Sequence, residues 1–547
     1  MPANVYAAVV LSMLAVAAFT AARLAFGDLV GRARVDRFRN VFVALTMISF
    51  VVSNYWIAVA LAAGAVWLFG RAEPVRPALF VAALFAMPAA EKEIPGFAGI
   101  NKFIDLTPVF VVTVVALLPA MWGRANQLVD LARLRAAARL FLAYLALACV
   151  LSFREVSATA GLRNSLDIFM TTAPMYVVFS RYDWRPAHLN ALAAAFVAQF
   201  VALAAVAGLE AVTGWHHYYE INARWDVDFR RRDFERAGIT RTVGPLLGSI
   251  SFGATFALAI LIATPLYRQM RVKLLGRAGF AALAAGLITT VSRGAWISTL
   301  IGLGAKAVVG PQGLSRLAFQ SVAGFVGRIG LSFTPFGDRL LSLLPFVGSS
   351  DTDTFDYRRL LFQVGSAEVM KNPLFGSVSY LDSPSMQVLV QGQGIIDIVN
   401  AYLQIALDNG LVGLGLYLGA AGAAAGALMS EIGRANASGR SGRGLDPVLV
   451  DYARTAFACF AAFAVLIATT TLVRAQTEQL NWMIIGLCVG MARKLRVEAR
   501  APASVAVEAS AEAAAAPRPS EPQSEPSRVD PSALPAHLRQ YVRRPDA

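Results

Sequence analysis

Three arginines of this sequence stand where an apolar stretch meets a polar one. Arg241 precedes "GPLLGSISFG", Arg293 lies within "TTVSRGAWIS", and Arg358 lies at the start of the amphipathic stretch "YRRLLFQVGSAEVM". A guanidinium is a planar, permanently charged group that binds phosphate oxygens in pairs. The neighbouring Gly244 and Gly294 would allow close approach of the backbone. Together these residues predict a site for a phosphate or diphosphate.

The surroundings of Arg293 are those of a membrane protein. Of the 547 residues, 57% are hydrophobic and 15% are charged, and the mean hydropathy is +0.56. A soluble protein would carry about a quarter charged residues. An arginine at the centre of a bilayer-spanning helix costs roughly 3 kcal/mol. We therefore expect Arg293 at a junction between two helices, the apolar runs 279–292 and 295–309.

The distribution of basic residues predicts the orientation of the helices. Four basic clusters lie in segments that we interpret as short loops between or beside apolar runs; they begin at Arg32, Arg124, Arg268 and Arg493. The positive-inside rule places these clusters in the cytoplasm. Because the net charge of +14 then has a topological cause, nucleic acid is not expected as a partner.

Counting the apolar runs predicts the fold class. Run lengths of roughly 20 residues indicate an all-α polytopic membrane protein with roughly 12 to 15 transmembrane helices and a cytoplasmic C-terminus. The runs 78–90 and 103–122 count as spans. The apolar segment 41–69 is too long for one ordinary span, so Asn54 at its middle is expected to mark a hairpin turn.

The same count divides the chain into six parts. Two of the parts are outer loops, and the last part is a tail that contains too few apolar residues to fold. The parts are the N-terminal transmembrane helices (1–212), an outer loop (213–243), the central helices with the junction turn at Arg293 (244–333), a large outer loop (334–404), the C-terminal helices (405–496) and a disordered cytoplasmic tail (497–547).

Other polar residues allow a plain structural interpretation. The arginines of 230–236 could simply pair with nearby carboxylates in a solvated loop. His216 and His217 are a weak pair, and no group of carboxylates, histidines or cysteines has metal-ligand spacing. We therefore expect neither a metal nor a cofactor.

Four motifs then give a family resemblance. "TTVSRGAWIS" resembles the serine-arginine-glycine turn of the superfamily of O-antigen ligases and Wzy-type O-antigen polymerases, and "RTVGPLLGSISFG" is similar to its Arg-x-x-Gly segment. "YRRLLFQVGSAEVMKNPLFGSV" resembles its Arg-x-x-Leu-aromatic helix followed by Pro-x-x-Gly. "VNAYLQIALDNGLVGLGLYL" resembles its His-Asn-x-Tyr-Leu segment followed by Gly-x-x-Gly. The four matches occur in family order.

The resemblance implies a GT-C-like membrane glycosyltransferase in the bacterial inner membrane, with its active site facing the periplasm. The implied donor is a glycan on undecaprenyl diphosphate and the implied acceptor a growing polysaccharide, with a flippase and a chain-length regulator as partners. Arginine would replace a metal ion at the leaving diphosphate. The implied catalytic residues are Arg241, Arg293, Arg358 and Asp397, and the implied substrate contacts are Ser292, Gly294, Gly244, Tyr357, Asn400 and Tyr402.

One departure from the family pattern bears on the reaction. Val399 stands where ligases that attach O-antigen to lipid A-core carry a histidine, and Asp397 lies two residues earlier. Asp397 could be a general base for the acceptor hydroxyl, or the N-cap of the following helix. The missing histidine favours a polymerase, which we expect to make an exopolysaccharide, over the alternative of a ligase or related oligosaccharide transferase. A flippase is a third alternative, which the absence of an internal repeat disfavours.

Overall fold

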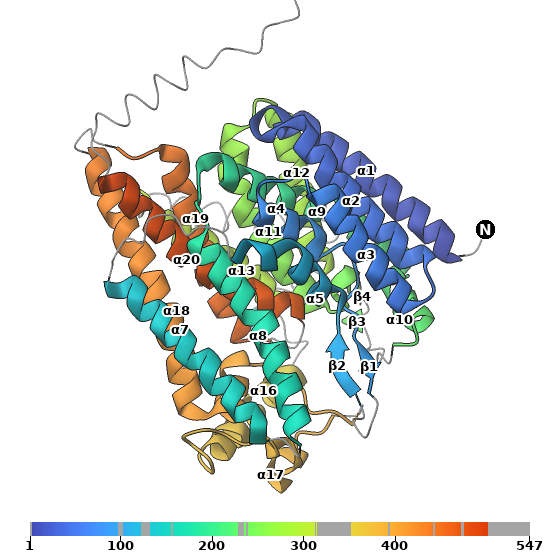
Figure 1. Cartoon of the computed structure of the whole chain (residues 1–547), viewed down its shortest axis with the longest axis vertical. Coiled ribbons are helices and arrows are strands. Elements are labelled where there is room, and N and C mark those ends of the chain that lie inside the picture. The colour runs from blue at the N-terminus through green and yellow to red at the C-terminus, as the bar shows by residue number, and fades with distance from the viewer. Residues whose placement is uncertain are drawn as a thin grey trace, which may run out of the picture. The chain divides into compact units, whose positions relative to one another are not determined.

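The computed structural model describes residues 3–96, 102–121, 132–154, 157–227, 235–236, 239–311, 313, 352–391, 394–440, 444–471 and 475–500. Most of the secondary structure within them is helical (Figure 1). Six described helices are long and apolar enough to cross a membrane: α1 (Ala3–Val30), α7 (Ala132–Leu151), α9 (Pro186–Thr213), α11 (Ser249–Gln269), α18 (Ala401–Arg440) and α19 (Pro447–Ile467). The protein is an all-α polytopic membrane protein, as the sequence predicted.

The other helices are shorter or more polar, so fewer spans than the expected 12 to 15 stand out by length and composition. They include α2 (Arg32–Val51), α3 (Tyr55–Gly70), α8 (Ala158–Arg181), α12 (Lys273–Thr289), α13 (Arg293–Val308) and α20 (Ala475–Arg500). A helix of 16 residues such as α13 is about 24 Å long, which is less than the hydrocarbon core of about 30 Å. The expected run 314–333 lies outside the described residues.

The N-terminal helices turn back where the sequence allows a sharp change of direction. Gly31, with φ of 93°, links α1 to α2. Asn54 begins α3, because its side chain accepts hydrogen bonds from the backbone N–H groups of Trp56 and Ile57. The predicted turn at Asn54 is therefore confirmed. The first basic cluster, however, lies in the first turns of α2 and not in a loop.

The structure replaces the expected spans 78–90 and 103–122 with shorter pieces. Helix α4 (Arg76–Leu84) has nine residues and is buried from Pro77 to Leu84. An antiparallel hairpin of β1 (Lys92–Pro95) and β2 (Lys102–Leu106) follows, with Lys92 opposite Leu106. The chain then continues through α5 (Pro108–Val112), a π-helical turn (Thr113–Leu117) and α6 (Leu118–Met121). The apolar residues of α4 thus pack against protein. Hydropathy alone does not distinguish burial within a protein from contact with lipid.

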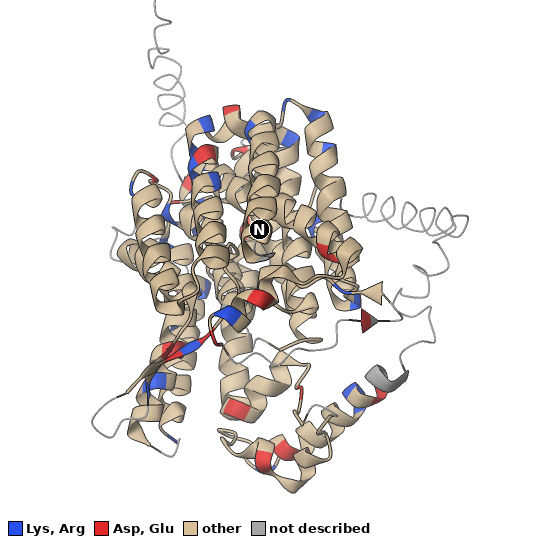
Figure 2. Cartoon of the chain, turned by 90° about the vertical axis from the view of Figure 1, so that its right-hand side faces the viewer, with Lys and Arg blue, Asp and Glu red and all other residues tan. Residues whose placement is uncertain are grey.

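The segments expected as outer loops contain short elements. The first carries α10 (His217–Arg224), β3 (Glu235–Arg236) and β4 (Ile239–Thr240), followed by a 3-10 turn (Gly244–Leu246). The second carries the predicted amphipathic helix, α16 (Thr352–Val369), then a 3-10 turn (Tyr380–Asp382) and α17 (Pro384–Gln387). A further 3-10 turn (Ser152–Arg154) extends α7. Figure 2 shows that charged residues lie mostly toward the ends of the helices, as expected for a bilayer-spanning bundle.

Helix α11 is central among the helices that carry the candidate site. It packs against α9, α12, α13 and α19, and α13 packs closely along α19. Helix α18 packs along α7 and also contacts α16 and α19. The arginine-bearing α13 and α16 are therefore both held against α18 and α19, directly or through one neighbour.

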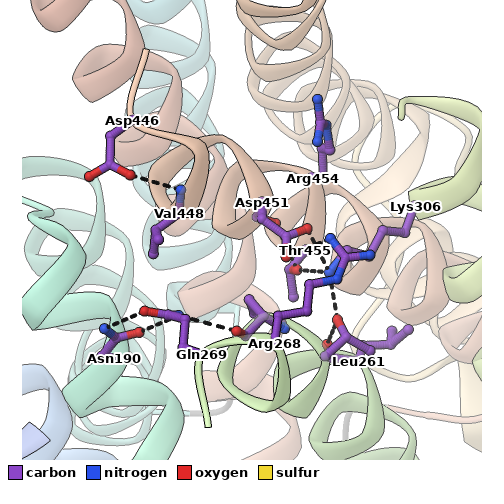
Figure 3. Close-up of polar contacts among 12 residues, drawn as sticks. Asn190, Leu261, Arg268, Gln269, Lys306, Asp446, Val448, Asp451, Arg454 and Thr455 are labelled. Carbon is purple, nitrogen blue, oxygen red and sulfur yellow. Dashed lines mark hydrogen bonds and ion pairs between the residues drawn. The ribbon is translucent and has the colours of Figure 1, made fainter. Parts of the chain in front are cut away.

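An ion-pair network around the buried carboxylate of Asp451 fixes α13 at the end opposite to Arg293 (Figure 3). The Lys306 Nζ atom lies 3.1 Å from Oδ1 of Asp451, and Nη1 of Arg268 lies 3.0 Å from Oδ2 of the same carboxylate. Lys306 also donates to the hydroxyls of Thr264 and Thr455, at 2.5 and 2.7 Å. Charges within a membrane bundle persist when they are paired in this way. The network joins α11, α13 and α19, and so sets the position of α13.

Candidate active site

The serine-arginine-glycine turn joins α12 to α13 through three residues, Thr290 to Ser292. Val291 adopts φ of 47°, a conformation that a β-branched residue rarely takes. The turn is held by Trp296, whose backbone N–H donates to the Ser292 carbonyl and whose indole donates to Leu287. Arg293 is the first residue of α13. The prediction that Arg293 lies at a helix junction is therefore confirmed.

Arg241 lies directly beside this turn. Its Nε donates to the Thr290 carbonyl at 3.2 Å. The backbone N–H of Thr242 donates to the Thr289 carbonyl at 3.1 Å. On the other side, Nε2 of His216 lies 2.9 Å from the Arg241 carbonyl oxygen. The Arg-x-x-Gly segment and the serine-arginine-glycine turn, distant in sequence, thus form one local structure.

A buried glutamate of α9 holds the same segment from the other side. The Glu210 carboxylate accepts hydrogen bonds from the backbone N–H groups of Val243 and Gly244, at 3.0 and 3.2 Å. Gly244 has φ of 50°, and a Cβ there would lie 2.6 Å from the Phe252 ring. These contacts explain glycine at 244 by packing. Its contact with substrate stays a prediction.

Arg358 reaches the turn through a residue that no motif marks. Its Nη2 lies 3.4 Å from the carbonyl oxygen of Thr469, just beyond the end of α19. The Thr469 hydroxyl also packs on Gly294, where a Cβ would lie only 2.7 Å from it. Thr469 therefore connects the Arg358 side chain to the start of α13. The three arginine-bearing segments meet at one end of the helix bundle.

Tyr357 connects α16 to the segment before α18. Its hydroxyl donates to the Asp397 carbonyl at 3.0 Å and accepts from the Asp397 N–H at 3.2 Å. Burial raises the pKa of the Tyr357 phenol, so the phenol stays protonated and able to donate. The Asp397 carboxylate is half-buried. Both backbone groups of Asp397 are thus fixed independently of its side chain.

The N-cap interpretation of Asp397 is wrong. Helix α18 begins at Ala401, and Asn400 caps it: the Asn400 Oδ1 accepts from the Leu403 N–H at 3.1 Å. Asp397 lies three residues before this cap, outside the helix. Tyr402, in the first turn of α18, donates to the Ala464 carbonyl of α19 at 2.8 Å. Asn400 and Tyr402 therefore have clear structural contacts, and their predicted contact with substrate is untested.

Comparison with known families agrees with this geometry. Residues 278–418 match the family model described as O-antigen ligase. Residues 278–418, the matched region, are therefore similar to this family. The matched region contains Arg293, Arg358, Asp397 and the cap of α18, whereas Arg241 lies outside the match and reaches it through Thr290. A search among curated proteins finds no match to the chain.

Two glycines of the matched region allow two backbone segments to lie in close contact. Helix α18 is broken at Gly410, which has φ of 71° and ψ of −176°. The Pro-x-x-Gly segment ending at Gly376 lies against this break: the Leu411 N–H donates to the Pro373 carbonyl at 2.7 Å. A Cβ at Gly376 or Gly410 would lie 2.2 Å from a backbone oxygen. These two motifs therefore form one structural unit that carries α16.

Arg154, which lies outside the matched region, binds this unit through its side chain. Its guanidinium donates to the carbonyls of Phe375, Gly376 and Asp408, at 2.9, 3.0 and 2.6 Å. We did not single out Arg154 from the sequence. Its position could have marked it as a candidate. Arg154 follows an apolar run on the expected outer side, where the positive-inside rule makes arginines uncommon.

The carboxylates of the described helices outside the four motifs include a close pair, Glu478 and Asp167. Glu478, in the first turn of α20, hydrogen-bonds to Thr171 of α8 and lies close to Asp167. The Asp167 side chain is exposed, and Glu478 is partly exposed. Neither residue lies in a sequence motif that would mark it as a candidate for the site. Both are candidates, besides Asp397, for accepting a proton.

No three side chains of histidine, cysteine, aspartate or glutamate gather at metal-binding distance in the part of the chain that the structure describes. The expected independence from metal ions stays a prediction, because it concerns the reaction. What the geometry does show is that the segments of Arg241 and Arg293 touch, and that Thr469 connects Arg358 to them.

Proposed function

We propose that this protein is a polysaccharide polymerase of the bacterial inner membrane. It transfers glycan repeat units from undecaprenyl diphosphate to a growing polysaccharide on the periplasmic face. The match of residues 278–418 to the O-antigen ligase family supports an enzyme of the glycosyltransferase type. The observation that carries the proposal is the meeting of the segments that bear Arg241, Arg293 and Arg358 around Thr290 and Thr469.

The proposed reaction follows from what guanidiniums do. The acceptor hydroxyl oxygen attacks C1 of the donor glycan, the bond from C1 to the diphosphate oxygen breaks, and the diphosphate leaves with the electron pair. A protein carboxylate takes the hydroxyl proton. Negative charge develops on the leaving oxygen, and arginines aimed at it lower the barrier without a metal ion. The donor thus loses its glycan, and the acceptor gains one repeat unit.

The residue at position 399 supports polymerase over ligase. Val399 is half-buried and packs on an apolar cluster that includes Leu361, Val369 and Ile398. It can neither accept a proton nor hydrogen-bond an acceptor. The match to the O-antigen ligase family favours the second candidate, a ligase that transfers finished glycan to another acceptor.

The products left in a deletion strain separate these two functions. Without a polymerase, cells are expected to display single repeat units on carrier or surface lipid, because each unit is made but never joined to the next. Without a ligase, cells would accumulate long polymer on the carrier. Electrophoresis of the extracted lipid-linked glycans distinguishes the two. Long carrier-linked polymer in the deletion strain would refute the polymerase and support the ligase.

The proposed orientation makes a separate prediction. Asp356, on α16 near Arg358, and Arg271, at the far end of α12 from the turn, are both exposed. In a variant without Cys149, Cys459 and Cys488, we expect Asp356→Cys to react with an impermeant maleimide in cells with a permeable outer membrane. Arg271→Cys should react only after lysis. The reverse pattern would place the arginines in the cytoplasm and remove the proposed periplasmic site.

A further inference from the structure

A cavity of about 220 Å³ lies between α18, α19 and α20. Its polar lining consists of Tyr402, Tyr417 and Asn481. The Tyr402 hydroxyl donates to the Ala464 carbonyl, and the Tyr417 hydroxyl donates to Asn481 Oδ1 at 2.9 Å. The rest of the lining is apolar and includes Ala421, Phe460 and Ile485. The cavity therefore combines a few polar groups with a mainly apolar wall.

The polar and apolar residues lie at different depths. Ile485 follows Asn481 by four residues on α20, and Ala421 follows Tyr417 by four on α18. Phe460 precedes Ala464 by four on α19, which runs in the direction opposite to α18 and α20. Ala421, Phe460 and Ile485 thus lie about one helical turn further from the arginine-bearing end than the polar groups named with them, which are Tyr417, the Ala464 carbonyl and Asn481. The cavity becomes more apolar with depth.

The polar end of the cavity lies below Arg358. Helix α19 ends at Ile467, and the Thr469 carbonyl just beyond it accepts from the Arg358 guanidinium. Ala464, whose carbonyl binds Tyr402, is about one turn below the end of the same helix. A molecule with its diphosphate at Arg358 could therefore place an attached apolar chain in this cavity.

One polar atom in the wall lacks a partner. Asn481 is only 4% exposed, and its Nδ2 has no hydrogen-bond partner among the described residues. A buried amide of this kind usually binds water or a ligand group. Its position in the lining of the cavity indicates that the cavity receives a molecule with a polar end.

The cavity opens sideways and continues along α18. Leu418 and Gly422, in its wall, are both exposed. A second hollow, of about 510 Å³, shares Gly422 and extends past Gly426 to Arg133 of α7. A long apolar chain could thus enter from the bilayer and follow one face of α18.

We propose that this cavity holds the first part of the polyprenyl chain of the lipid diphosphate donor, next to the diphosphate. The inference rests on the proposed function and adds the site that recognises the lipid. Arg358, above the polar end of the cavity, favours a chain that carries a diphosphate over the acyl chain of an ordinary phospholipid. The enzyme then recognises the donor by both its charge and its tail.

A glycine substitution tests the proposal with little disturbance of the fold. A Cβ at Gly422 would meet no atom within 4 Å. The same holds for Gly415 on the same helix, which does not line the cavity. Gly422→Leu should therefore fill the cavity, and Gly415→Leu is the matched control. Both variants are assayed as full chains in nanodiscs.

Each variant is given the same glycan on two diphosphates, one with the polyprenyl chain and one with an ethyl group. We expect Gly422→Leu to raise KM for the polyprenyl donor about tenfold, comparable to losing about two buried methylenes. KM for the ethyl donor should not change, and Gly415→Leu should change neither. An equal effect on both donors, or the same effect in both variants, would overturn the tail site.

A second measurement separates the donor lipid from bilayer lipid. A diazirine on the second isoprene unit of a polyprenyl diphosphate should label peptides of α18 to α20, and Gly422→Leu should reduce that labelling. Labelling that excess phospholipid abolishes would contradict the proposal. If wild-type protein transfers glycan from neither donor, the proposed function fails. If it transfers from both and Gly422→Leu affects both equally, only the tail site fails.

Discussion

Alanine in place of Arg241, Arg293 or Arg358 is expected to lower turnover by about 10²–10³-fold, the usual loss when one charged contact to a transition state is removed. The protein should remain in the membrane at normal abundance. The segments of Arg241 and Arg293 touch, and Thr469 connects Arg358 to them, so each variant should show a loss of this order. Turnover is measured on purified protein with lipid-linked repeat units in EDTA, where wild-type activity should persist.

Lysine variants and a neighbouring arginine are the controls for this prediction. Lysine should restore little activity, because an ammonium cannot bind two phosphate oxygens in the geometry of a guanidinium. Arg359 is exposed on α16 like Arg358, but it lies about 100° around the helix. Arg359→Ala should keep near-normal turnover. Near-normal turnover in Arg293→Ala would exclude Arg293 from the site, and loss of wild-type activity in EDTA, restored by magnesium, would show that the arginines do not act alone.

The local features of the site could be predicted from sequence because they follow local rules. An arginine flanked by apolar runs cannot lie mid-bilayer without a large cost, so Arg293 had to lie at a junction. The amphipathic pattern of α16 likewise gave a helix that carries Arg358. Hydropathy was less informative for α4, because a short apolar run can be buried in protein as well as in lipid.

The contacts that assemble the site could not be predicted in this way. Thr469 joins Arg358 to Gly294, and Glu210 binds the backbone at Gly244, through pairs far apart in sequence. Such pairs have no periodicity, and their residue types are common. The cap of α18 shows a different limit: Asp397 and Asn400 are equally good N-caps by type, so composition alone could not place the start of the helix.

Because Asn400 and not Asp397 caps α18, the substitution Asp397→Asn now has one main interpretation. If the Asp397 carboxylate is the general base, the amide should reduce turnover by about 10²–10⁴-fold. The contacts with Tyr357 should persist, since they involve only the backbone N–H and carbonyl of Asp397, which the substitution leaves in place. Measurements of turnover and of thermal unfolding on the same preparation test these two expectations, the loss of activity and the retained structure.

Two other carboxylates, Glu478 and Asp167, provide the comparison variants for this experiment. Glu478→Gln and Asp167→Asn remove the two carboxylates that lie near Thr171, outside the four motifs. If Asp397 is the base, both variants should keep turnover within a few-fold of wild type. A silent Asp397→Asn together with an inactive Glu478→Gln would instead place the proton acceptor on α20. In that case Asp397 would matter for its backbone contacts to Tyr357, and the valine at 399 would carry no information about which reaction the enzyme performs.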